Sequence, residues 1–193
     1  MRLFSTESLR LRRELAGTWE FRTECDTEVL LAAFARWDEA CLSRLRGMFA
    51  FAIWERDSRR LFLARDPFGI KPLYYRPLGR GLLFASELNA LTASGLGAPE
   101  VDPAAVASYL AWMAVPAPQT IQKGTLSLRA GEAVRFREGR LEIAAGWRFS
   151  TIPPARVCRS REEFTAELRA RLEESVRAHA VADVPVEIGR AHV

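Results

Sequence analysis

Few side chains of this sequence could do covalent or metal chemistry, because it holds only three cysteines and two histidines. The cysteines are Cys25, Cys41 and Cys158, and they form neither a Cys-x-x-Cys pair nor an even framework, so no disulfide or zinc site is expected. His179 falls late on a predicted surface helix and His192 lies two residues from the end. A nucleophile activated by a neighbouring histidine is therefore not expected, nor is a metal centre.

Cys25 next to Asp26 is the most reactive-looking pair in the chain. No helix N-terminus or cationic side chain is predicted beside the thiol to lower its pKa, so Cys25 is interpreted as a small residue at the end of a strand. Asp26 is the predicted N-cap of the helix that follows. The apolar face of that helix is predicted to consist of Val29, Leu30, Ala33, Phe34 and Trp37.

Composition and charge narrow the class of protein. The 193 residues are 49% hydrophobic and 27% charged, which is ordinary for a globular protein. The net charge of +4 comes from arginines scattered among acids, so no nucleic-acid partner is expected. No apolar run is long enough for a membrane span and the first residues do not resemble a leader, so a cytoplasmic location is predicted. Neither a GxxxxGK[ST] loop nor a GxGxxG loop occurs.

The hydrophobic pattern predicts helices and strands in one larger domain, with strands buried on both faces. Predicted helices span 8–16, 26–46 in two pieces, 87–94, 103–112 and 160–179. Predicted strands span 18–23, 48–55, 60–65, 71–75, 81–85, 132–136 and 140–143, with an irregular stretch at 119–130. The 160–179 helix should begin with a capping box of Ser160 and Glu163, and its apolar stripe is Phe164, Leu168, Leu172 and Val176.

Five ordered segments resemble the class II glutamine amidotransferases, and in particular their asparagine synthetase branch. The segments are CDTEVLL at 25–31, GMFAFAIW at 47–54, LARDPFGIKPLYY at 63–75, FASELNAL at 84–91 and VPAPQTI at 115–121. The resemblance extends over about residues 8–186. Because the segments come in the order and at the spacing of that family, the family supplies expectations for the fold and the site.

The resemblance implies an α+β fold, the αββα sandwich of N-terminal-nucleophile hydrolases, present in incomplete form over residues 1–150. Residues 151–159 are expected to be a linker, and residues 160–186 the first helix of an α/β ATP-pyrophosphatase domain. Residues 187–193, EIGRAHV, resemble the translation of a sequencing adaptor and are expected to be a non-native tail. With strands missing upstream, the 48–55 strand is expected to expose an unpaired edge.

The reaction implied by the resemblance begins with an N-terminal cysteine that attacks the amide of glutamine, using its own α-amine as the base. The ammonia released then reacts with an aspartate activated by ATP and Mg²⁺ in the second domain. Asp26 matches the family aspartate that binds the α-amino group of glutamine, whereas Arg65 and Asp66 are interpreted as a pair that braces a turn. This chain begins Met1-Arg2-Leu3-Phe4, so no catalytic residue is assigned and the fragment is expected to be inactive and to bind no cofactor itself.

The expected partners of the parent enzyme are glutamine, aspartate and ATP, and a homodimer is possible. Two alternatives remain open. One is a related amidotransferase with a different acceptor, such as a sugar or a cell-surface polymer. The other is a domain without the catalytic cysteine that serves as a scaffold or binding module.

Overall fold

The computed structural model describes residues 2–3, 5–97, 100–144, 146 and 160–180. The predicted linker at 151–159, the predicted tail at 187–193, Cys158 and His192 lie outside the described residues. The chain divides into two compact units, one formed by Met1–Arg2 with Leu42–Arg148 and the other by Leu3–Cys41 with Phe149–Val193.

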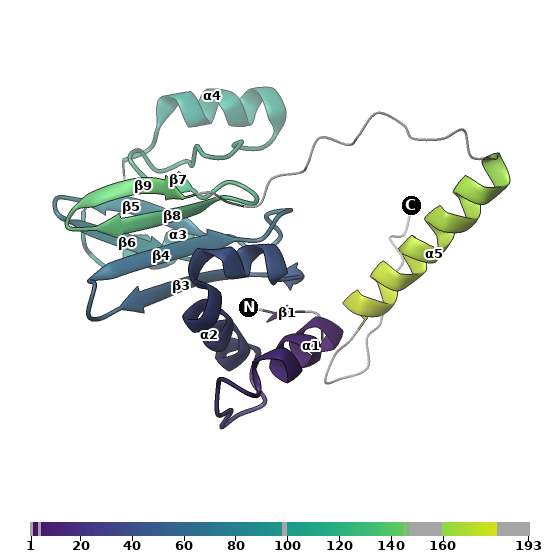
Figure 1. Ribbon diagram of the computed structural model, residues 1–193. Helices are drawn as coiled ribbons and strands as arrows, with labels where there is room; N and C mark the ends of the chain where they lie inside the picture. Colours follow the sequence, from purple (N-terminus) through teal and green to yellow (C-terminus); the bar gives the residue numbers. More distant parts are fainter. Residues whose placement is uncertain (1, 4, 98–99, 145, 147–159, 181–193) are drawn as a thin grey trace. The chain divides into compact units, whose positions relative to one another are not determined.

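The first unit contains most of the strands, which form two antiparallel sheets (Figure 1). The larger sheet has the order β3-β4-β8-β9, and its strands are β3 (Ala50–Glu55), β4 (Arg60–Arg65), β8 (Ala133–Arg137) and β9 (Arg140–Ala144). The smaller sheet has the order β6-β5-β7, and its strands are β5 (Tyr74–Leu78), β6 (Gly81–Ala85) and β7 (Leu126–Ser127). The short strands β1 (Arg2–Leu3) and β2 (Gly47–Met48) form a separate pair.

The core of the first unit lies between the two sheets. Leu61 and Leu63 of β4 lie opposite Phe136 and Val134 of β8 in the register of the larger sheet. Their buried cluster also includes Leu73, Tyr75 and Leu128, which come from the smaller sheet and the residues next to it. The four middle residues of β4 are buried on both faces of the strand, as its uninterrupted apolar sequence predicts.

Two helices complete the first unit. They are α3 (Leu88–Ala93) and α4 (Pro103–Trp112). Asp102 is the N-cap of α4, because its carboxylate accepts a hydrogen bond from the N–H of Ala104 at 2.9 Å. Pro103 stands in the first turn, where its missing N–H costs no helical hydrogen bond. The sequence predicts this helix start correctly.

Most of the described secondary structure of the second unit is helical. Its elements are α1 (Ser5–Leu15), α2 (Asp26–Trp37) and α5 (Arg161–His179), and the 3₁₀ helix η1 (Asp38–Arg44) begins in this unit and ends in the first. The face predicted for α2 is confirmed, since Val29, Leu30, Ala33 and Phe34 are buried and Trp37 is half-buried. Leu11 and Leu15 of α1 are buried as well.

The structure corrects the predicted strand at 18–23, which is irregular backbone. Its N–H groups bond to side chains and a turn instead of to a neighbouring strand. Arg22 and Thr23 donate to the carboxylate of Glu28, and the N–H of Trp19 donates to the carbonyl of Leu15. An alternating pattern favours a strand only when a partner strand is available.

Three other boundaries in the first unit also differ from the prediction. The strand expected at 48–55 is broken at Phe49, whose carbonyl accepts a hydrogen bond from the N–H of Asp66. The strand expected at 71–75 begins only at Tyr74, because the N–H of Lys71 donates to Asp66 and Pro72 has no N–H. The stretch expected to be irregular at 119–130 contains β7.

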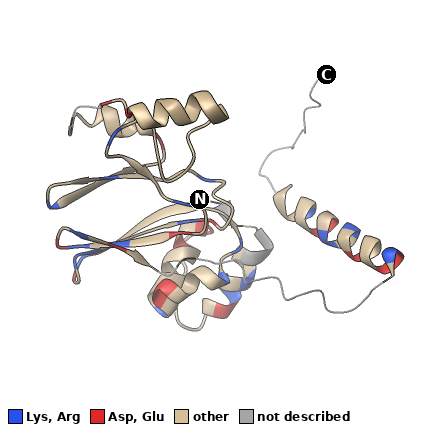
Figure 2. Cartoon of the chain, turned by 90° about the horizontal axis from the view of Figure 1, so that it is seen from above, with Lys and Arg blue, Asp and Glu red and all other residues tan. Residues whose placement is uncertain are grey.

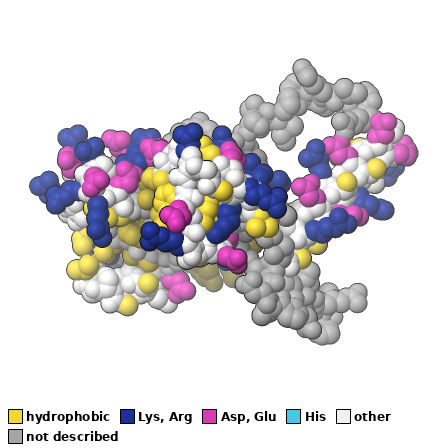
Figure 3. All heavy atoms as spheres, turned by 60° about the horizontal axis from the view of Figure 1, so that its bottom comes forward, with side chains coloured by type: hydrophobic (Ala, Val, Ile, Leu, Met, Phe, Trp, Pro, Cys, Tyr) yellow, Lys and Arg dark blue, Asp and Glu magenta, His cyan; other side chains and the backbone are white. Residues whose placement is uncertain are grey.

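Helix α5 begins with the predicted capping box, in which Ser160 Oγ accepts from the N–H of Glu163 at 3.1 Å. Its predicted apolar stripe is exposed, and Phe164, the first residue of the stripe, has 62% of its surface accessible. Salt bridges link Arg171 to Glu167 and Arg177 to Glu173 along the helix. Figure 3 shows side chains of both charges on it, with apolar groups between them.

Among the described residues, no helix has both the length and the apolar character needed to cross a membrane.

Candidate functional site

The first candidate site is the N-terminus of α2, where the sequence Cys25-Asp26-Thr27-Glu28 turns into the helix. The N-cap is Cys25 and not Asp26, because the Sγ atom of Cys25 accepts a hydrogen bond from the N–H of Thr27 at 3.5 Å. The predicted cap role of Asp26 is therefore wrong. Asp26 is the first residue of the helix, half-buried, where the positive end of the helix dipole favours a carboxylate.

This geometry also changes the interpretation of Cys25. The thiol is exposed and does have a helix N-terminus of its own, which the sequence analysis did not foresee. Hydrogen bonding by Thr27, through its side chain and its backbone, lowers the pKa of Cys25. Cys41 is the opposite case, since burial, followed by the nearby charges of Asp38 and Glu39, raises the pKa of its thiol to about 12.

Glu28 is the residue of this segment that the sequence analysis missed. Its carboxylate accepts hydrogen bonds from the Thr23 hydroxyl at 2.6 Å, the Thr23 N–H at 2.7 Å and the Arg22 N–H at 2.8 Å. Led by the Thr23 hydroxyl, these bonds lower the pKa of Glu28 from 4.5 to about 2. The position three residues after an N-cap was the available signal, because a glutamate there often reaches back to N–H groups before the helix.

The segment before α2 is held from its other side by Arg12 of α1. The Nη2 atom of Arg12 donates to the carbonyl of Thr23 at 2.5 Å, and its guanidinium lies 4.4 Å from the centre of the Phe21 ring. Glu28 and Arg12 together therefore fix residues 19–25. Since Cys25 and Asp26 continue from this segment, the backbone that leads to both side chains is anchored within the second unit.

The second candidate is the Arg65-Asp66 pair at the end of β4. Asp66 is fully buried, and its carboxylate accepts hydrogen bonds from the N–H groups of Phe68, Ile70 and Lys71 at 3.1, 3.0 and 2.9 Å. Both oxygens are thus engaged with the backbone of the turn that follows. A carboxylate bound in this way organises a loop and has little capacity left for a substrate.

Arg65 completes the same turn. Its guanidinium donates to the carbonyls of Lys71, Gly69 and Leu128 at 2.8, 2.6 and 2.5 Å, and also to the Ser127 hydroxyl at 3.2 Å. These bonds connect the turn to β7 and the residue after it. The geometry agrees with the prediction that Arg65 and Asp66 brace a turn.

A cavity of about 360 Å³ lies beside this turn in the first unit. Its lining residues are Arg65, Tyr74, Leu88, Val115, Ala117, Gln119, Thr120, Ile121 and Ser127. Most of the polar groups already bond within the protein. For example, the Gln119 side chain accepts from the Ser108 hydroxyl, and Thr120 donates to the carbonyl of Thr125. Among the described residues that line it, no nucleophile stands next to a base.

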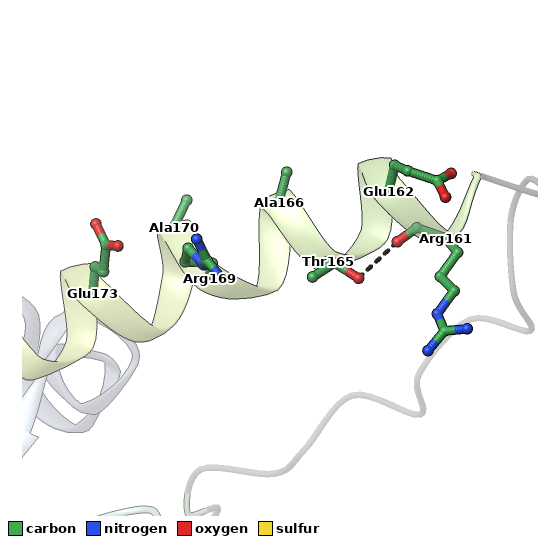
Figure 4. Close-up of a pocket in the computed structure, with 7 residues that line it drawn as sticks. All are labelled: Arg161, Glu162, Thr165, Ala166, Arg169, Ala170 and Glu173. Carbon is green, nitrogen blue, oxygen red and sulfur yellow. Dashed lines mark hydrogen bonds between the residues drawn. The ribbon is translucent and has the colours of Figure 1, made fainter.

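A hollow along α5 offers less chemistry still (Figure 4). All of its described lining residues belong to this one helix, and the hydrogen bond drawn there joins the Thr165 hydroxyl to the carbonyl of Arg161 at 2.7 Å. His179 at the end of α5 is exposed, and its Nδ1 lies 2.7 Å from the carbonyl of Ser175. Within the described ranges, no group of three or more His, Cys, Asp or Glu side chains could hold a metal ion.

The α+β fold with antiparallel sheets is similar to that of solved structures of amidotransferases. It is similar to the glutamine phosphoribosylpyrophosphate amidotransferase from B. subtilis, solved with ADP and GMP, with a TM-score of 0.52, 21% identity and coverage of 74% of this chain and 27% of that one. A structure described as the allosteric regulatory enzyme of purine biosynthesis matches with a TM-score of 0.53 and 21% identity, over 74% of this chain and 26% of that one. The expected α+β fold is confirmed.

The chain belongs to the glutamine amidotransferase domain family, whose pattern matches residues 4–147. It is 36% identical over 180 residues to asparagine synthetase [glutamine-hydrolyzing] 1 of Bacillus subtilis, covering 92% of this chain and 28% of the relative. It is 32% identical to the amidase chry2 of Gibberella zeae, covering 93% of this chain and 26% of the relative. The chain thus spans less than a third of the length of these two relatives.

Proposed function

We propose that this chain is the glutamine-binding portion of a glutamine-hydrolysing asparagine synthetase, and that Asp26 binds the α-ammonium group of glutamine. The observation that supports the proposal is the position of Asp26, a half-buried carboxylate in the first turn of α2, next to the N-cap residue Cys25. A carboxylate in this position can pair with an ammonium group through charge-assisted hydrogen bonds.

Glu28 has a supporting role in this proposal. Its carboxylate accepts hydrogen bonds from the N–H groups of Arg22 and Thr23, and these bonds fix the backbone that leads to Asp26. The carboxylate of Asp26 then meets the substrate in one orientation rather than many, which reduces the entropy lost on binding.

The remaining steps of the parent reaction are assigned to polypeptide outside this chain. Aspartate, ATP and Mg²⁺ belong to the proposed second half-reaction, in which the ammonia released from glutamine is consumed. Among the residues that the structure describes, no group of three or more His, Cys, Asp or Glu side chains could hold a metal ion, and the sequence contains no GxxxxGK[ST] loop.

The test uses the complete reading frame that contains this chain. Glutamate production from glutamine and asparagine production from aspartate are measured for the wild type and for Asp26→Asn. Loss of one charged hydrogen bond, about 1.5–3 kcal/mol, predicts a rise of roughly 10- to 160-fold in the KM for glutamine. The KM for aspartate and the activity with added ammonia should not change, since neither depends on glutamine binding.

Asp57→Asn is the matched control, because Asp57 is an exposed carboxylate in the turn between β3 and β4. It should leave the KM for glutamine at the wild-type value. An equal KM in Asp26→Asn and Asp57→Asn would show that Asp26 does not bind glutamine.

A second candidate is an amidotransferase that transfers ammonia to another acceptor, as the sequence analysis left open. It is supported by the name of one relative, the amidase chry2, at 32% identity. The same experiment separates the two candidates. Glutamine-dependent asparagine formation supports the synthetase, whereas glutamate production without asparagine supports a different acceptor.

A further inference from the structure

The cavity beside the turn of Arg65 and Asp66 has polar groups that the fold leaves unused. Its volume of about 360 Å³ is at the small end of the range for ligand pockets, roughly 300–1,000 Å³. Tyr75 of β5 packs in the core between the two sheets, so its neighbour Tyr74 lies on the opposite face of the strand. Tyr74 pairs with Ser127 of β7 in the register, and both residues line the cavity. The face of the smaller sheet that is turned away from the core is therefore one wall of the cavity.

The loop 115–121 supplies further lining residues and is held by hydrogen bonds on both sides. The N–H of Gln119 donates to the carbonyl of Pro116 at 3.0 Å, and the N–H of Ser127 donates to the carbonyl of Pro118 at 2.8 Å. The Ser108 hydroxyl of α4 donates to Oε1 of Gln119 at 3.0 Å. A cavity with walls fixed in this way is formed before a ligand arrives, which lowers the entropy cost of binding.

Two lining groups have no hydrogen-bond partner among the described residues, the hydroxyl of Tyr74 and the Nε2 atom of Gln119. Tyr74 and Gln119 are half-buried. In the part of the chain that the structure describes, no buried or half-buried side chain has a nitrogen or oxygen atom that is both shut off from solvent and without a partner. Both groups are thus open to a ligand. Together they offer one O–H and two N–H donors.

The charge of the cavity is positive. The guanidinium of Arg65 uses four of its N–H groups on three carbonyls and a hydroxyl, and no carboxylate of a described residue pairs with it. The neighbouring Asp66 carboxylate is bonded to three backbone N–H groups of the following turn. Residues 103–121 contain no charged side chain, and Figure 2 draws α4 within them in the neutral colour. An uncompensated cation and three free donors favour an anion that accepts hydrogen bonds.

The rest of the described lining is apolar and restricts the kind of anion. It consists of Leu88, Val115, Ala117 and Ile121. An aliphatic chain gains free energy against such a wall, whereas a phosphate or a sugar would lose hydration there without new partners. The ammonium group of an amino acid would find no carboxylate among the described lining residues. A carboxylate with a short hydrocarbon chain meets both halves of the cavity.

We propose that this cavity binds an aliphatic carboxylate of about four to six carbon atoms, a size that suits a pocket at the small end of the range. The Tyr74 hydroxyl and Nε2 of Gln119 donate to the carboxylate oxygens, and Arg65 supplies the positive charge. The hydrocarbon chain packs on the apolar residues of the lining. The site belongs to the first unit, whereas Asp26 belongs to the second, so this proposal does not depend on the proposed role of Asp26.

The test is a titration of the full chain with sodium hexanoate, followed by the nuclear magnetic resonance signals of the side-chain amides. The chain has only three such amides, those of Asn89, Gln119 and Gln122. The Gln119 signal should shift and saturate with a dissociation constant of about 1 mM or lower. The Gln122 signal is the internal control, because its Nε2 already donates to the Thr92 hydroxyl at 2.8 Å. From acetate to butyrate to hexanoate, each added CH₂ should tighten binding about four-fold.

Two variants test the donors. Tyr74→Phe removes only the hydroxyl and should raise the dissociation constant for hexanoate at least about ten-fold. Gln119→Glu keeps an acceptor for the Ser108 hydroxyl but replaces the free donors by a carboxylate oxygen, so binding should be lost. Tyr109→Phe and Asn89→Asp are the matched controls, since both residues are exposed in the first unit and neither lines the cavity. Both controls should bind hexanoate like the wild type.

Four results would overturn the proposal. The first is a Gln119 signal that does not move at about 20 mM hexanoate, well above the expected dissociation constant. The second is equal affinity in the wild type, Tyr74→Phe and Gln119→Glu, which would place the ligand elsewhere. The third is hexanamide bound as tightly as hexanoate, which would exclude recognition of an anion. The fourth is binding by this chain that disappears in the complete reading frame, since adjoining polypeptide would then fill the cavity.

Discussion

Replacing Asp66 by asparagine tests how the turn after β4 is held together. The carboxylate is fully buried and accepts three backbone hydrogen bonds, two at Oδ1 from Phe68 and Ile70 and one at Oδ2 from Lys71. Asparagine keeps the shape but has one acceptor oxygen. In its better orientation the amide keeps the bonds to Phe68 and Ile70, and its NH₂ group then faces the N–H of Lys71.

The cost follows from that geometry. One charge-assisted hydrogen bond is lost, worth about 1.5–3 kcal/mol, and two donors are left facing each other in a buried place. We expect a loss of about 3 kcal/mol in the free energy of unfolding. With a urea m-value of about 2 kcal/mol/M, the unfolding midpoint should fall by roughly 1.5 M. The unfolding midpoint of Asp66→Ala should be lower still, because this substitution removes the acceptors of all three hydrogen bonds.

The assay is urea unfolding followed by circular dichroism, with amide hydrogen exchange as a local measurement. The amides of Phe68, Ile70 and Lys71 should exchange faster in Asp66→Asn than in the wild type, since they are the donors to the carboxylate. Asp57→Asn is the control and should unfold like the wild type. A midpoint for Asp66→Asn within about 0.3 M of the wild type would refute the reasoning.

Two other predictions concern the second unit and the 3₁₀ helix. Because the pKa of Glu28 is lowered in the folded state from 4.5 to about 2, its contribution to stability is present above pH 4.5 and is lost as the pH falls towards 2. The free energy of unfolding of Glu28→Gln should therefore be lower than that of the wild type at pH 6, and the difference should be smaller at pH 2.5. A difference that is the same at both pH values would contradict the hydrogen bonds to Thr23 and Arg22. Cys25 is exposed and its pKa is lowered, so it should react with iodoacetamide at pH 8 much faster than buried Cys41, whose pKa is raised to about 12. Peptide mapping by mass spectrometry measures the two reaction rates. Similar rates would show that the helix-cap geometry is wrong.

The sequence by itself determined the elements whose hydrogen bonds are local. The Asp102-Pro103 helix start and the capping box of Ser160 and Glu163 each depend on residues within a few positions of one another. The hairpin pairs β3 with β4, the next strand along the chain, and all three features were predicted. The family was also identified from ordered segments of sequence, and the match over residues 4–147 confirms it.

The tertiary structure decided the features whose partners are distant or ambiguous in sequence. Residues 18–23 alternate polar and apolar side chains but do not form a strand. Their backbone groups near Thr23 make hydrogen bonds to the side chains of Glu28 and Arg12 instead. The N-cap of α2 is Cys25, although the sequence favours its neighbour Asp26, because aspartate is among the preferred N-cap residues. The guanidinium of Arg65 donates to the carbonyl of Leu128, 63 positions further along the chain, and the carbonyl of Asp66 accepts a hydrogen bond from the N–H of Gly131. Sequence periodicity reports which face of an element is buried, but a hydrogen bond between distant residues forms only after folding brings its donor and acceptor together.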